Sequence, residues 1–166
     1  MGSLLRVPTP LATDRRGNVL TDLSIASIAH LDEAAERTPC PLSLVVLVDE
    51  TRGTVLFGCN RWRQEYELPG GMVGEGETYH DAAQRELEEE SGIRTDTLEL
   101  LGYARFSLAD PARDELGAIY VASATNQSPQ DSAELDAFIW RRPLSASTLA
   151  ISPLDDAIAD WALRVR

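Results

Sequence analysis

The chain contains 166 residues, a length that suits one domain with its own core, and we expect residues 1–166 to fold as a single unit. Its formal net charge is −12 at pH 7, which disfavours binding to nucleic acid polymers and acidic membranes and favours a small-molecule ligand. All fifteen cationic side chains are arginine, for which genomic base composition is the favoured explanation, although a planar guanidinium also suits phosphate binding.

Residues 1–40 form an N-terminal extension with weak structural signals. A turn at residues 14–18 precedes Val19 and Leu20, which indicates a hairpin or an edge strand, and residues 25–37 carry a weak helical pattern. We expect this extension to pack either on the sheet or on the second subunit of a homodimer.

Three features predict a cytoplasmic protein. Residues 1–10 do not resemble a signal peptide, and the longest apolar run, residues 44–48, is far too short to span a bilayer. The two cysteines, Cys40 and Cys59, are expected to be reduced, buried thiols.

The central part of the chain begins with a predicted hairpin. Residues 43–49 are rich in Val and Leu, as is typical of a buried strand, and a turn at residues 50–53 leads into a second strand at residues 54–57. Further along, Gly70 and Gly71 allow a tight turn and a close approach of the backbone to a ligand or metal.

A helix is predicted between Thr78, a suitable N-cap, and Gly92, a suitable C-terminal stop. It carries Glu86, Glu89 and Glu90, whose spacing of three and four residues places three carboxylates on one face. Because like charges at this spacing repel one another, we expect a divalent cation to hold them. Carboxylate oxygens favour Mg²⁺, with Mn²⁺ as the alternative.

The residues around this helix resemble a complete Nudix box: Gly71, Glu77, Arg85-Glu86-Leu87, Glu89-Glu90 and Gly92-Ile93. The resemblance implies a Mg²⁺-dependent hydrolase of nucleoside diphosphates linked to another moiety, with an α/β fold in which a mixed sheet is sandwiched between helices. It also implies that Glu86, Glu89 and Glu90 bind the metal and that the Gly70 carbonyl is a further ligand. Glu77 and Arg85 would form a supporting ion pair.

Four side chains between the hairpin and the Gly-Gly turn are candidates for substrate binding: Arg61, Trp62, Arg63 and Tyr66. Trp62 or Tyr66 can stack on a base, and Arg61 or Arg63 can reach a phosphate. The alternative is an aromatic packed at the sheet edge and two solvated arginines. We expect one of the four to contact the substrate.

After the box, strands are predicted at residues 98–106 and 116–122, with residues 108–115 forming an acidic loop between them. A further strand is expected at residues 137–140. A final helix should begin near Ser152 and present an apolar face to the core: Ile158, Trp161 and Val165.

Breaking a phosphoanhydride bond requires a nucleophilic water, neutralised phosphate charge and correct geometry, all of which bound Mg²⁺ can supply. Family members often add an acidic residue from a later loop as a ligand or general base. Glu134 is the better candidate here and Glu115 the second, and a solvated carboxylate is the alternative for both. We therefore expect Glu86, Glu89, Arg85 and Glu134 to be catalytic, whereas a role for His80 is less favoured.

Two functional classes compete. The first is a pyrophosphohydrolase acting on a nucleotide, such as a nucleoside triphosphate, an oxidised nucleotide, a nucleotide sugar or a dinucleoside polyphosphate. The second is a nucleotide-binding sensor that uses the same pocket without turnover. A purely structural role would leave the three carboxylates unexplained.

Overall fold

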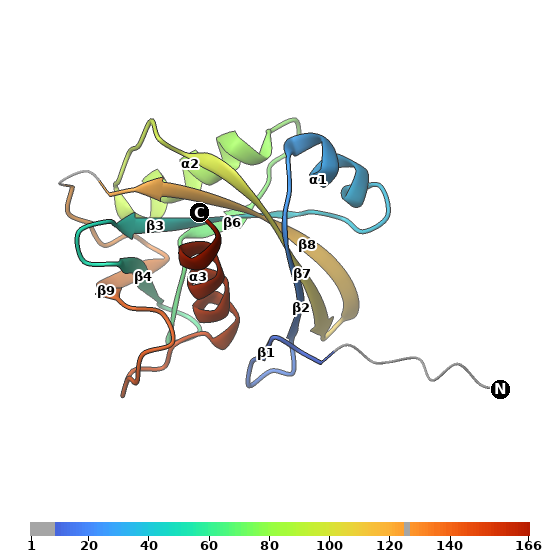
Figure 1. The fold of residues 1–166 in the computed structure, drawn as a ribbon. Coiled ribbons are helices and arrows are strands. Elements are labelled where there is room, and N and C mark those ends of the chain that lie inside the picture. Colours follow the sequence, from blue (N-terminus) through green and yellow to red (C-terminus); the bar gives the residue numbers. More distant parts are fainter. Residues whose placement is uncertain (1–8, 125–126) are drawn as a thin grey trace.

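The computed structural model describes residues 9–124 and 127–166. Within these residues it has nine strands and three helices (Figure 1). The strands are β1 (Ala12–Thr13), β2 (Val19–Ile25), β3 (Leu42–Asp49), β4 (Thr54–Asn60), β5 (Glu65–Glu67), β6 (Gly70–Met72), β7 (Glu99–Ala109), β8 (Ala112–Ser123) and β9 (Leu135–Arg141). The helices are α1 (Ile28–Ala35), α2 (Tyr79–Ser91) and α3 (Pro153–Val165).

The strands form one mixed sheet in the order β1-β2-β7-β8-β3-β4-β5, with β6 paired to β3 and β9 paired to β4. β3 runs parallel to β8, whereas the other pairs of strands are antiparallel. Helix α3 covers one face of the sheet, and α1 and α2 cover the other (Figure 1). This arrangement confirms the predicted α/β fold with a mixed sheet between helices.

Each face of the sheet has its own apolar core. Leu20, Phe57 and Ile158 are fully buried on the face covered by α3, and Leu56 and Leu87 are fully buried on the face covered by α2. Successive side chains of a strand point to opposite faces, so neighbouring residues of β4 contribute to both cores. The two cores fix the positions of α2 and α3 on either side of the sheet.

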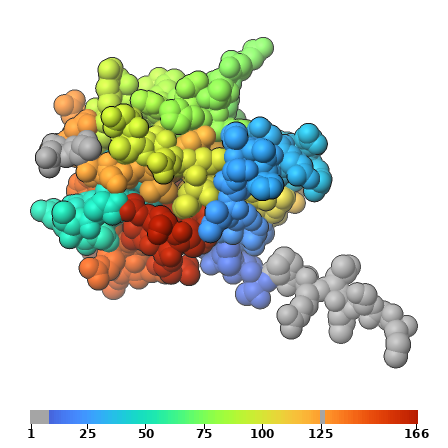
Figure 2. All heavy atoms as spheres, turned by 45° about the horizontal axis from the view of Figure 1, so that its top comes forward, coloured from blue at the N-terminus to red at the C-terminus, as the bar shows by residue number. Residues whose placement is uncertain are grey.

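Helix α3 has the apolar face predicted from the sequence. Ile158 and Trp161 are buried, and Val165 packs against the same core. Figure 2 shows the C-terminal end of this helix, in red, next to the turn between β3 and β4, in teal. Arg166 at that end forms an ion pair with Glu50 in the turn.

The described part of the N-terminal extension contributes two strands to the sheet. β1 and β2 form the hairpin that was one of the two alternatives, and β2 pairs with β7 along its length. The predicted helix at residues 25–37 is shorter than expected and occupies Ile28–Ala35. Residues 1–8 of the extension lie outside the described part of the chain.

The prediction of an acidic loop at residues 108–115 is wrong. β7 continues to Ala109 and β8 begins at Ala112, so that only two residues remain between the strands. Leu108 pairs with Arg113 across the hairpin. Antiparallel pairing satisfies the backbone while one face stays in water, so polar residues at the end of a hairpin do not end its strands.

The other predicted strands are present. β3 and β4 form the expected hairpin, with Val48 opposite Val55. β9 contains the predicted residues 137–140 and is longer by residues at each end, because it pairs with β4 from Val55 to Asn60.

Two further observations concern the cysteines and the length of the helices. Cys40 and Cys59 are free thiols, as expected, but both are half-buried rather than buried. Burial raises the pKa of the Cys40 thiol to about 11, which keeps it protonated and unreactive at neutral pH. Among the described helices, none combines the length and the apolar composition required to cross a membrane.

Helix α2 begins and ends where the sequence predicted. The Thr78 side chain accepts a hydrogen bond from the Asp81 amide at 3.0 Å, and Gly92 ends the helix in the left-handed conformation with φ of 70°. β6, immediately before α2, pairs with the first residues of β3. One short stretch of chain, residues 70–91, therefore supplies both β6 and α2.

Glycine is required at two positions where β6 approaches β3 and α2. A Cβ on Gly70, whose φ is 152°, would lie 2.4 Å from the Ser43 carbonyl oxygen and 2.8 Å from the Leu44 Cα. A Cβ on Gly71 would lie 2.6 Å from the Glu86 carboxylate. The Gly-Gly pair therefore allows α2 to place its side chains directly against the backbone of β6.

An ion pair joins α2 to the loop before it. Arg85 Nε donates to Glu77 Oε1 at 2.8 Å, and its Nη2 donates to Glu77 Oε2 at 3.0 Å. The Gly74 amide also donates to Glu77, at 2.8 Å. The hydrogen bonds from Arg85, followed by that from Gly74, lower the pKa of Glu77 to about 2.

We predict that Gly70→Ala destabilises the fold more than Gly53→Ala. Both glycines have positive φ, but a Cβ on Gly53 would have no atom within 4 Å. Gly53→Ala should reduce the free energy of unfolding by about 1 kcal/mol, and Gly70→Ala by roughly 3 kcal/mol or more, because the β3 backbone must shift. Urea denaturation of both variants measures the difference, and equal losses would contradict the close approach.

We predict that Glu77→Gln removes part of the pH dependence of stability. Since the folded pKa of Glu77 is lowered to about 2, its contribution is fully present above the unfolded value near 4.5 and disappears as the pH falls through 2. The melting temperature of the variant should be lower than wild type at pH 7, and the two should converge toward pH 2.

Glu75→Gln is the matched control for this measurement. Glu75 lies in the same loop and is exposed, and within the described residues its side chain makes no hydrogen bond or ion pair. A shift of Glu75→Gln as large as that of Glu77→Gln would show that loop charge alone, and not the pair with Arg85, controls stability.

Candidate functional site

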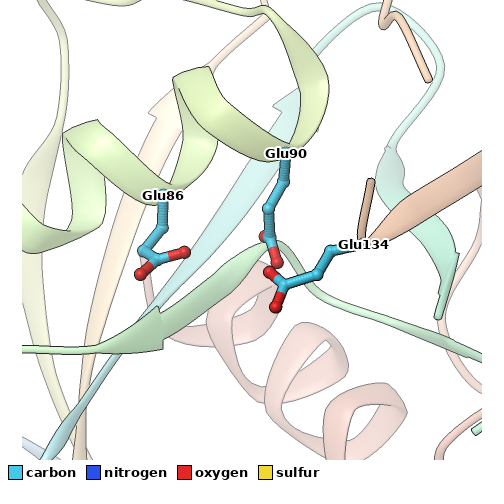
Figure 3. A group of neighbouring side chains, drawn as sticks. All are labelled: Glu86, Glu90 and Glu134. Carbon is cyan, nitrogen blue, oxygen red and sulfur yellow. The ribbon is translucent and has the colours of Figure 1, made fainter. Parts of the chain in front are cut away.

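Three carboxylates from two parts of the chain converge beside the sheet. Glu86 and Glu90 project from α2, and Glu134 is the residue just before β9. The three side chains point toward one another (Figure 3). One oxygen from each residue lies within 4.8 Å of the others. At an Mg–O distance of about 2.1 Å, opposite ligands lie about 4.2 Å apart, so this cluster is close to the size of a divalent-cation site.

Pairing between β4 and β9 determines where Glu134 lies. Asn60 is opposite Leu135, and the Arg61 amide donates to the Glu134 carbonyl at 3.0 Å. The Ser132 side chain accepts hydrogen bonds from the amides of Glu134 and Leu135, at 3.2 and 3.0 Å. The backbone around Glu134 is therefore held in place although its side chain is exposed.

Of the two buried carboxylates, Glu86 pairs with Arg85, whereas Glu90 has no basic partner among the described residues. Burial, followed by the charges of Glu86 and Glu134, raises the pKa of Glu90 to about 9, although the hydrogen bond from the Gly70 amide acts in the opposite direction. Burial also raises the pKa of Glu86, against the effect of Arg85. A cation at the cluster would supply the missing charge and allow these groups to ionise.

Glu89 lies outside this cluster, in contrast to the expected set of three helical carboxylates on one face. Its side chain is 60% exposed and lies 3.1 Å from Arg85. Residues advance by about 100° around a helix, so Glu86 and Glu90 are about 40° apart, whereas Glu89 is about 100° from Glu90. Its place in the helix directs it toward the rim of the cluster.

Arg85 contacts protein groups with all of its donor nitrogens. Besides the pair with Glu77, its Nη1 donates to Glu86 Oε1 at 2.7 Å and its Nη2 donates to the Met72 carbonyl at 3.0 Å. The guanidinium therefore connects the loop, β6 and the first carboxylate of the cluster. This geometry suits the positioning of Glu86 rather than direct contact with a reacting group.

Gly70 contacts the cluster through its amide. The Gly70 N–H donates to Glu90 Oε2 at 2.8 Å, which fixes the orientation of that carboxylate. The expectation was a metal contact from the Gly70 carbonyl, and the hydrogen bond from the amide is an additional contact that the sequence did not indicate.

The three carboxylates line a cavity of about 560 Å³, a volume typical of small-molecule sites. Its apolar walls come from β3, β7 and α3, and its polar walls include the turn between β1 and β2. Eight acidic side chains line it: Asp14, Glu65, Glu67, Glu86, Glu90, Glu115, Glu134 and Asp155. Two basic side chains line it: Arg16 and Arg63.

Of the four candidates for substrate binding, Arg63 lines this cavity. Arg61, Trp62 and Tyr66 are not among the residues that line it. Trp62 is 69% exposed, and Tyr66 packs against the core beneath α3, as in the alternative of an aromatic at the sheet edge. Substrate stacking on either ring would therefore need a pose that extends beyond the cavity.

Glu115 and His80 differ in their relation to the cavity. Glu115 is 8% exposed and lines it, but its carboxylate lies 3.1 Å from the Arg113 guanidinium. His80 is exposed and makes an edge-on contact with the Tyr120 ring, with ring centroids 5.7 Å apart, away from the cavity lining.

Sequence reasoning missed two parts of the cavity. The turn at residues 14–18 was recognised as a turn, but nothing local indicated that Asp14, Arg16 and Asn18 would line a ligand site. Ser152 and Asp155, at the start of α3, also line the cavity, whereas the sequence indicated only that a helix begins near Ser152. Their part in the cavity follows from the packing of α3 and the N-terminal hairpin on the same face of the sheet.

The chain resembles proteins of known sequence and structure. It is 40% identical to an oxidized purine nucleoside triphosphate hydrolase of Mus musculus over 81 residues, which are 48% of this chain and 48% of that protein. The chain thus matches about half the length of this relative.

Two solved structures share the fold. The Escherichia coli dihydroneopterin triphosphate pyrophosphohydrolase superimposes with a TM-score of 0.63 at 21% identity, covering 75% of this chain and 95% of that chain. The NUDIX domain of Shewanella oneidensis NrtR, complexed with ADP ribose, gives a TM-score of 0.64 at 16% identity, covering 84% and 98%. Residues 41–162 match the model of the NUDIX domain family. The chain therefore belongs to the NUDIX domain family.

Proposed function

We propose that this protein is a Mg²⁺-dependent pyrophosphohydrolase that uses water to cleave a phosphoanhydride bond of a purine nucleoside triphosphate. The observation that carries the proposal is the cluster of Glu86, Glu90 and Glu134 in the lining of a cavity large enough for a small ligand. Hard carboxylate oxygens are the donor set that Mg²⁺ prefers, and Mn²⁺ can replace it.

The residues of the cluster have distinct parts in this proposal. Glu86 and Glu90, both buried, would hold the ion from α2, and Glu134 would hold it from the β9 side or accept a proton from the attacking water. When bound, Mg²⁺ neutralises phosphate charge and lowers the pKa of a bound water. Glu89, exposed beside the cluster, would contribute a further ligand once the phosphates are in place.

The supporting groups keep these carboxylates in a productive geometry. Arg85 orients Glu86 through a hydrogen bond of 2.7 Å, and its pair with Glu77 anchors the guanidinium. The Gly70 amide orients Glu90 in the same way. Such supporting contacts matter because a carboxylate displaced by about 1 Å loses its place around a metal or a phosphate.

The choice of substrate rests on the cavity and on one relative. In this proposal the phosphates lie at the carboxylate cluster, beside α2 and β6, and the base contacts the apolar lining from β7 and α3. The matched protein of Mus musculus is named as a hydrolase of oxidized purine nucleoside triphosphates. A purine nucleoside triphosphate fits both observations.

A substrate panel tests this function. Nucleoside triphosphates, their oxidised purine forms, nucleotide sugars and dinucleoside polyphosphates should be incubated with the protein, with and without Mg²⁺, and phosphate products measured. We expect turnover of purine triphosphates that is abolished by a chelator and restored by Mg²⁺ or Mn²⁺. Tight nucleotide binding without any turnover would instead support the sensor alternative.

We predict that Glu90→Gln and Glu134→Gln lower kcat roughly 100-fold or more while the fold is retained, because a charged metal ligand is lost and its shape is kept. Glu89→Gln should also lower kcat, but it should weaken Mg²⁺ binding less than Glu90→Gln, since Glu89 lies outside the cluster. Kinetics at saturating Mg²⁺ and titration calorimetry of Mg²⁺ measure the two effects.

Glu88→Gln is the matched control on the same helix. Glu88 pairs with Arg94 and is not part of the carboxylate cluster. Its variant should keep wild-type turnover and Mg²⁺ affinity. Near-wild-type activity of Glu90→Gln would refute the assignment of the cluster as the metal site.

A further inference from the structure

We infer that Arg16, in the turn between β1 and β2, determines which purine the site accepts, by donating hydrogen bonds to the acceptor edge of a guanine-type base. This inference rests on the proposed function. Arg16 is one of two basic residues that line the cavity, and it lies outside the segment at residues 41–162 that matches the family. The N-terminal extension would thus add a base-recognition residue to the domain that matches the family.

The turn between β1 and β2 lines the cavity at a distance from α2. In Figure 1 this turn is at the bottom of the view, whereas α2 is at the top. Glu86 and Glu90 line the cavity from α2, and Arg16 lines it from the hairpin. A triphosphate whose phosphates bind at α2, as in the proposed function, would extend its base toward the turn.

The backbone of this turn is held rigidly by its own side chains. Asp14 accepts hydrogen bonds from the amides of Arg16 and Asn18, at 2.8 and 2.9 Å, and from the Asn18 side chain at 2.9 Å. The Asn18 side-chain oxygen in turn accepts a hydrogen bond from the Ala109 amide of β7, at 3.0 Å. Arg16 thus projects from a preformed support, which reduces the entropy lost on binding.

The neighbouring residue, Arg15, connects the turn to the segment between β4 and β5. Arg15 Nη2 donates to the Arg63 carbonyl at 2.7 Å, and its Nε lies 4.0 Å from Glu65 Oε1. The two consecutive arginines thus differ: Arg15 joins the N-terminal hairpin to the segment between β4 and β5, whereas Arg16 is left for another partner.

Other side-chain donors that line the cavity already donate to neighbours: Asn18 to Asp14, Asn60 and Arg63 to Glu67, and Ser152 to Asp155. Within residues 9–124 and 127–166, the Arg16 guanidinium makes no hydrogen bond and no ion pair. Ionised carboxylates accept hydrogen bonds but cannot donate them. In this acidic cavity, Arg16 is the cationic group best placed to serve acceptors on a ligand.

The chemistry of the guanidinium decides between the two purines. Guanine presents two acceptors, O6 and N7, side by side, and the planar fork of arginine can donate to both. Adenine presents one acceptor, N7, beside an amino group that is itself a donor, so the same fork is mismatched. Arg16 should therefore favour guanine-type over adenine-type nucleotides.

We predict that Arg16→Gln reduces the ratio of kcat/KM for guanosine triphosphate over adenosine triphosphate about tenfold, mainly through KM for the guanosine substrate. Arg52→Gln is the matched control. Arg52 is an exposed arginine in the turn between β3 and β4, outside the cavity lining, and its variant makes the same change in charge. The control should keep the wild-type ratio.

Arg16→Lys separates the shape of the fork from its charge. Lysine keeps the positive charge but not the paired donors, so the ratio should remain low in this variant. Full recovery of the ratio by lysine, or equal losses for both nucleotides in Arg16→Gln, would overturn recognition of the base edge. An unchanged ratio in Arg16→Gln would overturn any role for Arg16 in selection.

Equilibrium binding keeps this test separate from catalysis. The affinities of guanosine and adenosine monophosphate for wild type and Arg16→Gln can be measured by calorimetry without turnover. If wild type hydrolyses no triphosphate, the proposed function fails, while a preference for guanosine monophosphate that Arg16→Gln abolishes still supports the recognition role. If wild type hydrolyses triphosphates and the variant keeps the same binding preference, the inference fails alone.

Discussion

The burial of two like-charged carboxylates against one strand of glycine backbone is the constraint on which this structure depends. Glu86 and Glu90 are 7% and 5% exposed, and the Gly70-Gly71 pair brings the β6 backbone against them. A single arginine and a single amide offset only part of the repulsion. In the proposed function a cation would complete this arrangement, and α2, β6 and the segment before β9 would then form one unit around it.

This constraint explains why supporting contacts are concentrated before and within α2. Arg85 is bonded to Glu77, Glu86 and the Met72 carbonyl, which fixes the loop, the helix and β6 relative to one another. If the guanidinium were free, the loop could move away from the carboxylates. Local rigidity around the cluster is therefore a consequence of placing negative charge in a partly dry environment.

The rest of the cavity is made by parts of the chain that lie far apart in sequence. The long hairpin of β7 and β8 and the pairing of β2 with β7 bring the N-terminal turn to the face that α3 covers. The bond from Asn18 to the Ala109 amide joins this turn to β7, and Arg15 joins it to the segment before β5. The N-terminal turn thus forms part of the cavity wall, although it lies outside residues 41–162, which match the family.

The sequence by itself determined the family resemblance, the α/β class, the limits of α2 and the presence of a carboxylate-rich helix, because helix caps, glycine turns and helical spacing are local properties. It indicated Glu134 as a candidate, but it could not decide whether Glu134 would join Glu86 and Glu90 or stay solvated, or whether Trp62 would line the cavity. Tertiary structure decided these points, along with the position of Arg16, since strand pairing and the packing of α3 bring together residues that no local spacing relates.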